Sequence, residues 1–96
     1  MITRIVRMTF TPEKTEEFLE IFRSSKEEIR GFEGCKHVEL LQDVNTPNVY
    51  STYSLWDSEG HLNEYRNSEL FGQVWPKTKK LFAAKPQAWS LISVDI

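Results

Sequence analysis

The side chains best suited to acid–base chemistry in this chain are its two histidines and three tyrosines. His61 and Tyr65 stand four positions apart in a segment with helical spacing, which puts both side chains on roughly one face of the helix. The neighbouring Leu62 indicates that this face turns inward. In the first turn of the helix the positive end of the dipole disfavours protonation of His61, leaving a neutral imidazole that could accept a proton. We predict His61 and Tyr65 as the catalytic pair, with solvent exposure of His61 as the alternative.

The other histidine and the single cysteine are weaker candidates. His37 alternates with Cys35 and Glu39 along a predicted strand, where a histidine beside a glutamate is more often a surface pair than a catalytic dyad. A lone cysteine forms no disulfide within the chain and no cysteine–metal site, so Cys35 is read as a small packing residue. The sequence also has no glycine-rich phosphate loop, zinc-ligand spacing or Ser-His-Asp series. We therefore expect no metal.

Arg4 is the one cation in phase with an apolar strand face, which it shares with Ile2, Val6 and Met8. Either it lies at the end of the sheet with its stem buried and its head in water, or it holds an oxyanion inside a cavity. The first arrangement is favoured because long side chains often reach out to solvent in this way.

The elements that must position these residues can be read from hydrophobic periodicity. Alternation of apolar and polar residues predicts strands over residues 2–10, 35–42, 49–56 and 86–96. Thr11 and Pro12 suit the start of a long helix that ends at Gly31. A second helical segment starts after the Asp57-Ser58 cap, breaks near residue 67, restarts at Ser68, is kinked or ended by Pro76, and has a tail to about residue 82.

The order β-α-β-β-α-β predicts an α+β, ferredoxin-like fold with a four-stranded antiparallel sheet in a single domain, residues 1–96. The third and last predicted strands are apolar on both sides, with Tyr53 and Leu55 opposite Tyr50 and Trp56, and Trp89 opposite Ile92. Two helices cover only one face of such a sheet. The other face is therefore expected to pack on the same face of a second copy, which makes a homodimer.

Composition narrows the function further. The formal net charge of −2 and the pI of about 5.7 provide no basic surface for a nucleic acid backbone. No apolar run approaches the roughly 20 residues of a membrane-spanning helix, and the N-terminus has no apolar signal core. We expect neither a nucleic acid nor a membrane as partner, and a cytoplasmic location.

The chain resembles the antibiotic biosynthesis monooxygenase family of dimeric α+β barrels over nearly its whole length. The resemblance rests on four motifs in order: the Thr11-Pro12 opening of the first helix, the Gly31-Phe32-Glu33-Gly34-Cys35 segment, the Trp56-Asp57-Ser58 corner, and the spacing of Leu62, Tyr65, Ser68 and Phe71. It implies a cofactor-independent monooxygenase that oxidises a small electron-rich aromatic or quinol-like compound with dioxygen. Substrate-binding residues are then expected at Arg4, Val6, Trp56, Phe71 and Trp75, with no cofactor.

Departures from the family pattern limit what can be carried over. Haem-degrading members have an asparagine, a tryptophan and an axial histidine at positions that correspond to Val6, Tyr65 and Trp75 here. Without that imidazole the iron lacks its proximal ligand, which argues against haem degradation. Many oxygenase-like members also carry a glutamate and a histidine where this chain has Ser54 and Tyr65.

Two other functions remain open. The barrel could bind a ligand without catalysis, or be filled by its own aromatic side chains, or it could be an isomerase of a small oxygenated metabolite with the same histidine and tyrosine as acid and base. A cavity on the order of 300 Å³, with Arg4, His61 or Tyr65 pointing into it, would favour an enzyme or a binding protein over a filled interior.

Overall fold

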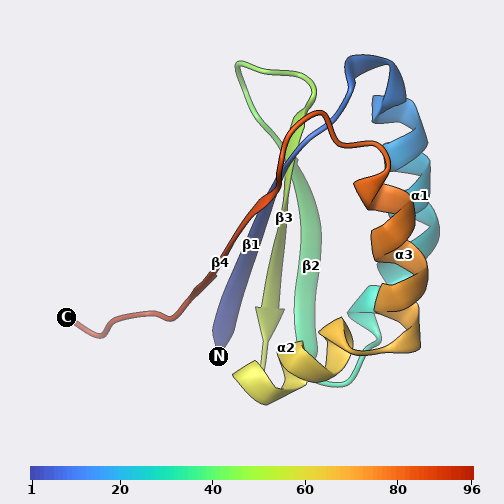
Figure 1. Ribbon diagram of the computed structural model, residues 1–96. Coiled ribbons are helices and arrows are strands. Elements are labelled where there is room, and N and C mark those ends of the chain that lie inside the picture. Colours follow the sequence, from blue (N-terminus) through green and yellow to red (C-terminus); the bar gives the residue numbers. More distant parts are fainter.

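The computed structural model describes all 96 residues as one antiparallel sheet with helices on one side (Figure 1). The strands are β1 (Ile2–Thr9), β2 (Cys35–Gln42), β3 (Val49–Trp56) and β4 (Gln87–Leu91), in the spatial order β2-β3-β1-β4. The helices are a 3₁₀ turn η1 (Pro12–Lys14), α1 (Thr15–Arg30), α2 (Glu59–Arg66) and α3 (Glu69–Lys79). This is the predicted α+β, ferredoxin-like architecture.

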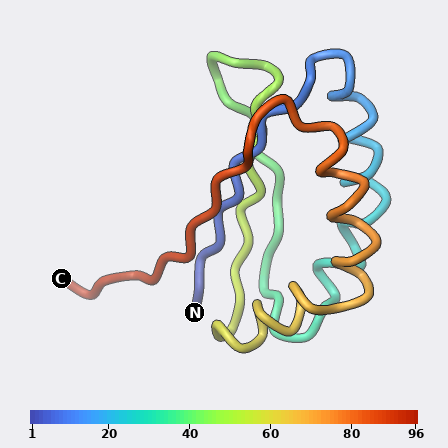
Figure 2. Tube along the Cα trace, in the orientation of Figure 1, coloured from blue at the N-terminus to red at the C-terminus, as the bar shows by residue number.

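The two faces of the sheet have different neighbours. In the register of β1 with β3, Arg4 pairs with Ser54, Val6 with Thr52 and Met8 with Tyr50, and these even-numbered residues face the helices. The tube in Figure 2 shows α1 and α3 side by side over this face, with no helix on the other side, toward which the C-terminal segment leads away. The even-numbered side chains of β1 and β3 therefore lie between the sheet and the helices.

The core lies at one end of this layer, around an aromatic pair. Phe10 is completely buried, and its ring stacks on that of Phe18 with 4.1 Å between centroids. Tyr50 and Phe82 meet the same ring at 6.2 and 5.4 Å. Met8 and Leu81 complete the buried cluster, so the layer between sheet and helices is closed by packed side chains at the end near η1.

The serine caps form where the sequence predicts them. Ser58 Oγ accepts a hydrogen bond from the His61 amide, and Ser68 Oγ accepts one from the Phe71 amide, both at 3.2 Å. These bonds satisfy amides in the first turns of α2 and α3, and the helical segment breaks at Asn67 between them.

None of the helices has the length and apolar character needed to span a bilayer.

Two predicted boundaries are wrong, and one of the two alternatives predicted at Pro76 is excluded. α1 begins at Thr15, because the first turn after Thr11 is 3₁₀ and the Thr11 side chain caps nothing. Pro76 lies inside α3 without ending it, since the carbonyl that loses its amide partner belongs to the exposed Gly72 and is accessible to water. β4 ends at Leu91 and does not continue to residue 96, because Leu91 already pairs with Thr3 and β1 soon offers no further partner.

Candidate functional site

A cavity of about 290 Å³ lies between the sheet and the helices. Every strand and all three α-helices contribute to its lining, which is mostly apolar. The volume is just below the roughly 300–1,000 Å³ of small-molecule sites, so the cavity suits a small, compact ligand such as one of two or three fused rings. The interior is therefore not filled by the protein's own side chains.

Aromatic rings form one wall of the cavity. The ring of Tyr65 stacks on that of Trp56 with 5.0 Å between centroids and meets Phe71 edge-on at 5.3 Å. Phe71 in turn stacks on Trp75 at 5.6 Å. These four rings and Val6 all line the cavity, so the residues predicted to bind substrate come together around one space.

The corner between β3 and α2 sets the position of this wall. The indole N–H of Trp56 donates to Ser54 Oγ at 3.0 Å, which orients the buried ring at the end of β3. Ser68 Oγ donates to the Tyr65 carbonyl at 2.6 Å while accepting from the Phe71 amide. Because one serine binds the backbone of both aromatic residues, α2 and α3 hold Tyr65 and Phe71 in a fixed relation.

The hydroxyl of Tyr65, a residue of the cavity lining, is largely buried and makes no hydrogen bond within the chain. Every fully buried side-chain oxygen or nitrogen has a partner, so this oxygen is not fully buried. Burial, with a smaller contribution from the Cys35 thiol, raises the pKa of Tyr65 to about 12. At neutral pH the hydroxyl is therefore protonated and acts as a hydrogen-bond donor, not as a base.

His61 lies outside the cavity lining. Its Nδ1 is 2.8 Å from Ser58 Oγ, within the cap of α2. Its ring also occupies the space beside Gly34, whose φ is +86°, so that a Cβ on Gly34 would lie 2.3 Å from the ring. The structure thus separates the predicted pair: Tyr65 lines the cavity, and His61 packs against the turn before β2.

Arg4 lines the cavity, and so does a second arginine that the sequence analysis missed. Arg4 Nη1 donates to Ser90 Oγ on β4 at 3.0 Å, and partial burial together with the charge of Arg66 lowers the pKa of its guanidinium. Arg66, the last residue of α2, is exposed and lies at the edge of the same cavity. Its position four residues after the inward-facing Leu62 is the signal that could have identified it.

The ionisable groups of the cavity are therefore Arg4, Arg66 and Tyr65, and its lining contains no carboxylate, imidazole or thiol. His37 and Cys35 lie elsewhere. His37 Nε2 is 2.9 Å from Glu39 Oε1 on the sheet face away from the helices, and burial raises the pKa of the Cys35 thiol. No group of three or more His, Cys, Asp or Glu side chains is arranged to hold a metal ion.

A second hollow, of about 480 Å³, lies between α1 and α3. It is more open to solvent, and most of its lining residues are polar or charged, including Glu17, Glu20 and Lys77. It lacks the apolar wall that shields a bound small molecule from water. The cavity between sheet and helices is therefore the better candidate, although its volume is smaller.

The fold and the sequence both have known relatives. The chain spans almost all of a crystal structure named antibiotic biosynthesis monooxygenase, with a TM-score of 0.93, 19% identity, and 99% and 100% of the two chains covered. A conserved protein from Methanosarcina mazei Go1 superposes with a TM-score of 0.89 at 24% identity, covering 95% of this chain and 91% of that one. Rv0793 from Mycobacterium tuberculosis gives 0.89 at 16% identity, with 99% and 96% covered. These likenesses establish the fold.

A comparison with curated proteins finds no match. The family model described as antibiotic biosynthesis monooxygenase matches residues 1–75, which include β1 to α2, most of α3 and nearly all of the cavity wall. The chain therefore belongs to the antibiotic biosynthesis monooxygenase family.

Proposed function

We propose that this protein is a monooxygenase that oxidises a small electron-rich aromatic or quinol-like compound with dioxygen, without a bound cofactor. Family membership supports oxygenation, and one observation carries the assignment to this cavity. An apolar, aromatic-walled space is lined by two arginines and by a tyrosine that is protonated at neutral pH, and by no acidic side chain. Such a space favours a flat apolar substrate that becomes an anion.

In this reaction the substrate itself supplies the electrons. Taking anthrone as an example, its enol loses a proton to water, and the anion transfers one electron to dioxygen. The two radicals combine into a carbon-bound peroxide, which breaks its O–O bond as the second hydrogen of that carbon leaves as a proton. One oxygen atom stays as the new carbonyl of anthraquinone, and the other leaves as water.

The residues of the cavity have distinct roles in this proposal. The positive charges of Arg4 and Arg66 lower the pKa of the substrate hydroxyl, because an opposite charge within about 4–6 Å favours the ionised form by roughly 1–3 units. The Tyr65 hydroxyl donates to the oxyanion or to the peroxide oxygen. Trp56, Phe71 and Trp75 hold the rings of the substrate, and Val6 closes the cavity from the sheet side.

A ligand-binding barrel without catalysis is the second candidate. It is favoured by the cavity's lack of a general base, because Ser54 and Tyr65 stand where many oxygenase-like relatives have a glutamate and a histidine. The same lack counts against the isomerase hypothesis, since His61, its proposed acid or base, does not line the cavity.

Oxygen uptake with anthrone and 1,4-dihydroxynaphthalene distinguishes the two functions. We expect consumption of one O₂ per anthrone, with one atom of labelled oxygen in the anthraquinone, after dialysis against a chelator. Val6→Trp, which fills the cavity, should reduce kcat/KM by about tenfold or more, because a ligand cannot occupy the same space. Val44→Trp, the same substitution at an exposed loop position, is the control and should leave it unchanged.

Two results would contradict the proposal in different ways. Uptake no faster than in buffer, combined with binding of the same compounds, would leave only the ligand-binding function. Equal rates for the wild-type protein and for Val6→Trp would show that the reaction does not occur in this cavity.

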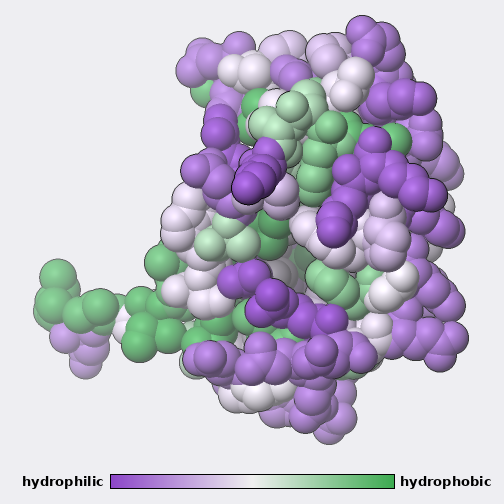
Figure 3. Space-filling model, in the orientation of Figure 1, coloured by the Kyte–Doolittle hydropathy of each residue, from purple (hydrophilic) through white to green (hydrophobic).

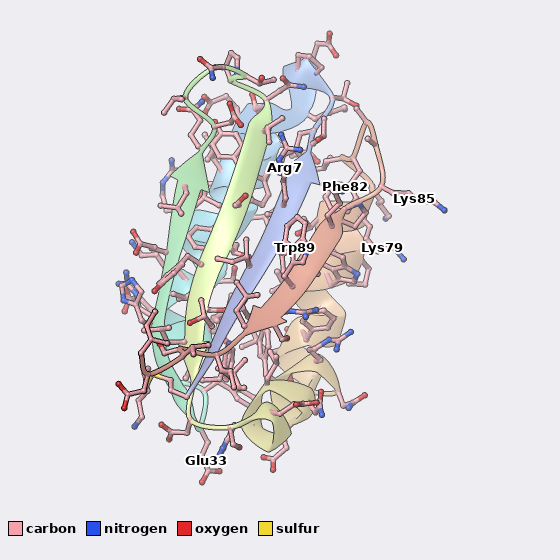
Figure 4. All side chains as sticks on the ribbon, turned by 90° about the vertical axis from the view of Figure 1, so that its left-hand side faces the viewer. Arg7, Glu33, Lys79, Phe82, Lys85 and Trp89 are labelled. Carbon is pink, nitrogen blue, oxygen red and sulfur yellow. The ribbon has the colours of Figure 1, made fainter.

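We also propose that the working form is a homodimer joined through the sheet face opposite the helices. Figure 4 views the molecule from this side, where the strands lie in front of the helices and Trp89 stands on β4 beside β1. Ile5 lies between Tyr53 and Trp89 in the register, and Leu55 and Leu91 flank Thr3 on the same face. Trp89 is 43% and Leu91 51% exposed in the single chain.

The C-terminal segment extends the same apolar surface. Figure 3 shows residues after β4 projecting from the body as a hydrophobic arm, and Ile92, Val94 and Ile96 are all exposed. An apolar face that continues into an apolar arm is typical of an interface between subunits. A second copy of the same sheet, packed face to face, would cover both.

Light scattering coupled to size exclusion tests the dimer. We expect twice the chain mass of 11.3 kDa for the wild-type protein at micromolar concentration. Ile5→Glu should raise the dissociation constant by more than about 100-fold, because it buries an unpaired carboxylate in each copy of the interface. Asn63→Glu adds the same charge at an exposed position of α2 and should remain dimeric. A wild-type monomer with native circular dichroism would refute the proposal.

A further inference from the structure

The arginines of this chain fall into two groups. Arg7, Arg23 and Arg30 each form an ion pair, with Asp43, Glu20 and Glu27 respectively. Arg4 and Arg66 form none, and they are the two arginines that line the cavity. The chain has five arginines in all, so both of the arginines without an ion pair are found where a ligand would bind.

The cavity offers these two charges no internal counter-ion. Its lining contains no aspartate or glutamate, and the polar partner of Arg4 is the neutral hydroxyl of Ser90. Arg4 and Arg66 are close enough for the charge of one to lower the pKa of the other. Like charges held at one apolar cavity are unfavourable unless an anion joins them.

We propose that the substrate of this cavity is a hydroxylated aromatic carboxylic acid, whose carboxylate is bound by Arg4 and Arg66. This inference rests on the proposed function, which requires a reacting hydroxyl on the same ring system. The oxyanion formed during oxidation balances only one of the two positive charges, and it exists only while the reaction proceeds. A permanent negative charge on the substrate balances the other charge at the binding step.

The chemistry of the site favours a carboxylate over other anions. A guanidinium presents its N–H groups in a planar fork that matches the two oxygens of a carboxylate. A phosphate monoester would bring about two charges, which leaves an excess once the ring hydroxyl ionises. The aromatic wall of Trp56, Tyr65, Phe71 and Trp75 takes the rings, so the arginines at one side of the cavity orient the substrate.

Calorimetric titration with 2-naphthoate and with naphthalene-2-carboxamide tests the inference without any reaction. The two probes share their shape, and only the first is charged. We expect the wild-type protein to bind naphthoate about tenfold or more tightly than the carboxamide, the usual range for hydrogen bonds to charged groups. This preference should shrink with added salt, because the exposed Arg66 is screened.

Variants assign the preference to the arginines. Arg4→Gln should remove most of the tenfold preference for naphthoate, and Arg66→Gln should lower this preference by a smaller factor, about two- to threefold. In both variants the affinity for the carboxamide should stay within about twofold of the wild-type value. Arg7→Gln is the matched control, on the same strand but on the opposite face and paired with Asp43, and it should change neither affinity. Equal affinity of the wild-type protein for both probes would overturn the inference, a comparison that requires no variant to fold.

Failure of the carboxylate inference and failure of the proposed function give different results. If neutral quinols are oxidised and naphthoate shows no preference, the carboxylate inference is wrong and the monooxygenase function stands. If naphthoate is preferred and neither the neutral quinols nor 1,4-dihydroxy-2-naphthoate is oxidised, the cavity is a binding site for organic acids and the monooxygenase function falls.

Discussion

Replacing Phe10 by alanine is expected to lower the free energy of unfolding by about 3–5 kcal/mol, the usual cost of removing a large aromatic ring from a packed core. Phe10 is completely buried, stacks on Phe18 at 4.1 Å and also contacts Tyr50 and Phe82. Domains of this size have a total stability of roughly 5–15 kcal/mol, so the variant should be close to unfolding. Urea denaturation followed by circular dichroism measures the loss.

Phe71→Ala provides the matched comparison. Phe71 is the same residue type, but it is only half-buried and belongs to the cavity lining. It has fewer packing contacts to lose, and we expect a loss of about 1–2 kcal/mol, below the usual range for a core phenylalanine. Equal losses for the two variants would indicate that the cavity wall is packed as tightly as the core, which contradicts an open cavity.

The parts of the fold that the sequence predicts correctly are those fixed by local interactions. Alternation in β1 and β3 depends only on which face each residue occupies, and the register bears it out at Ile5 and Tyr53. Ser58 and Ser68 cap the helices that follow them because their hydroxyls reach amides three residues away. Such short-range bonds do not depend on the rest of the molecule.

The boundaries that the sequence predicted wrongly or left open depend on distant residues. The end of β4 is set by where β1 begins, since Leu91 pairs with Thr3 and the residues after it soon pass the end of the partner strand. The alternating apolar pattern of residues 92–96 cannot reveal this. The continuation of α3 past Pro76 depends likewise on the exposure of Gly72, which is a property of the folded chain.

The candidate site was found only in part for a similar reason. Leu62, Tyr65 and Arg66 follow helical spacing and line the cavity together, whereas His61, one position earlier, is turned toward Ser58 and Gly34. Helical spacing gives positions on a face to within about one residue, so it could not separate His61 from Leu62. The ring of His61 fits where it does because Gly34 has no Cβ, a contact between residues 27 positions apart.

Tyr65→Phe should reduce kcat for oxidation by about 10²–10³-fold, the usual effect of removing one donor to a developing oxyanion, while KM changes by less than about threefold. The substitution removes only the hydroxyl, so the stack on Trp56 and the contact with Phe71 remain to hold the substrate. Steady-state oxygen uptake at several substrate concentrations separates kcat from KM.

His61→Ala tests whether catalysis uses the predicted pair, His61 and Tyr65, or Tyr65 alone. Because His61 does not line the cavity, its removal should leave kcat within about threefold of the wild-type value once folding is verified. The loss in Tyr65→Phe should also be the same at about pH 6 and pH 9, because a hydroxyl with a pKa of about 12 is a donor at both values. An equally large loss in His61→Ala, or a rate that rises with ionisation of Tyr65, would restore the acid–base pair and exclude a role for Tyr65 as donor alone.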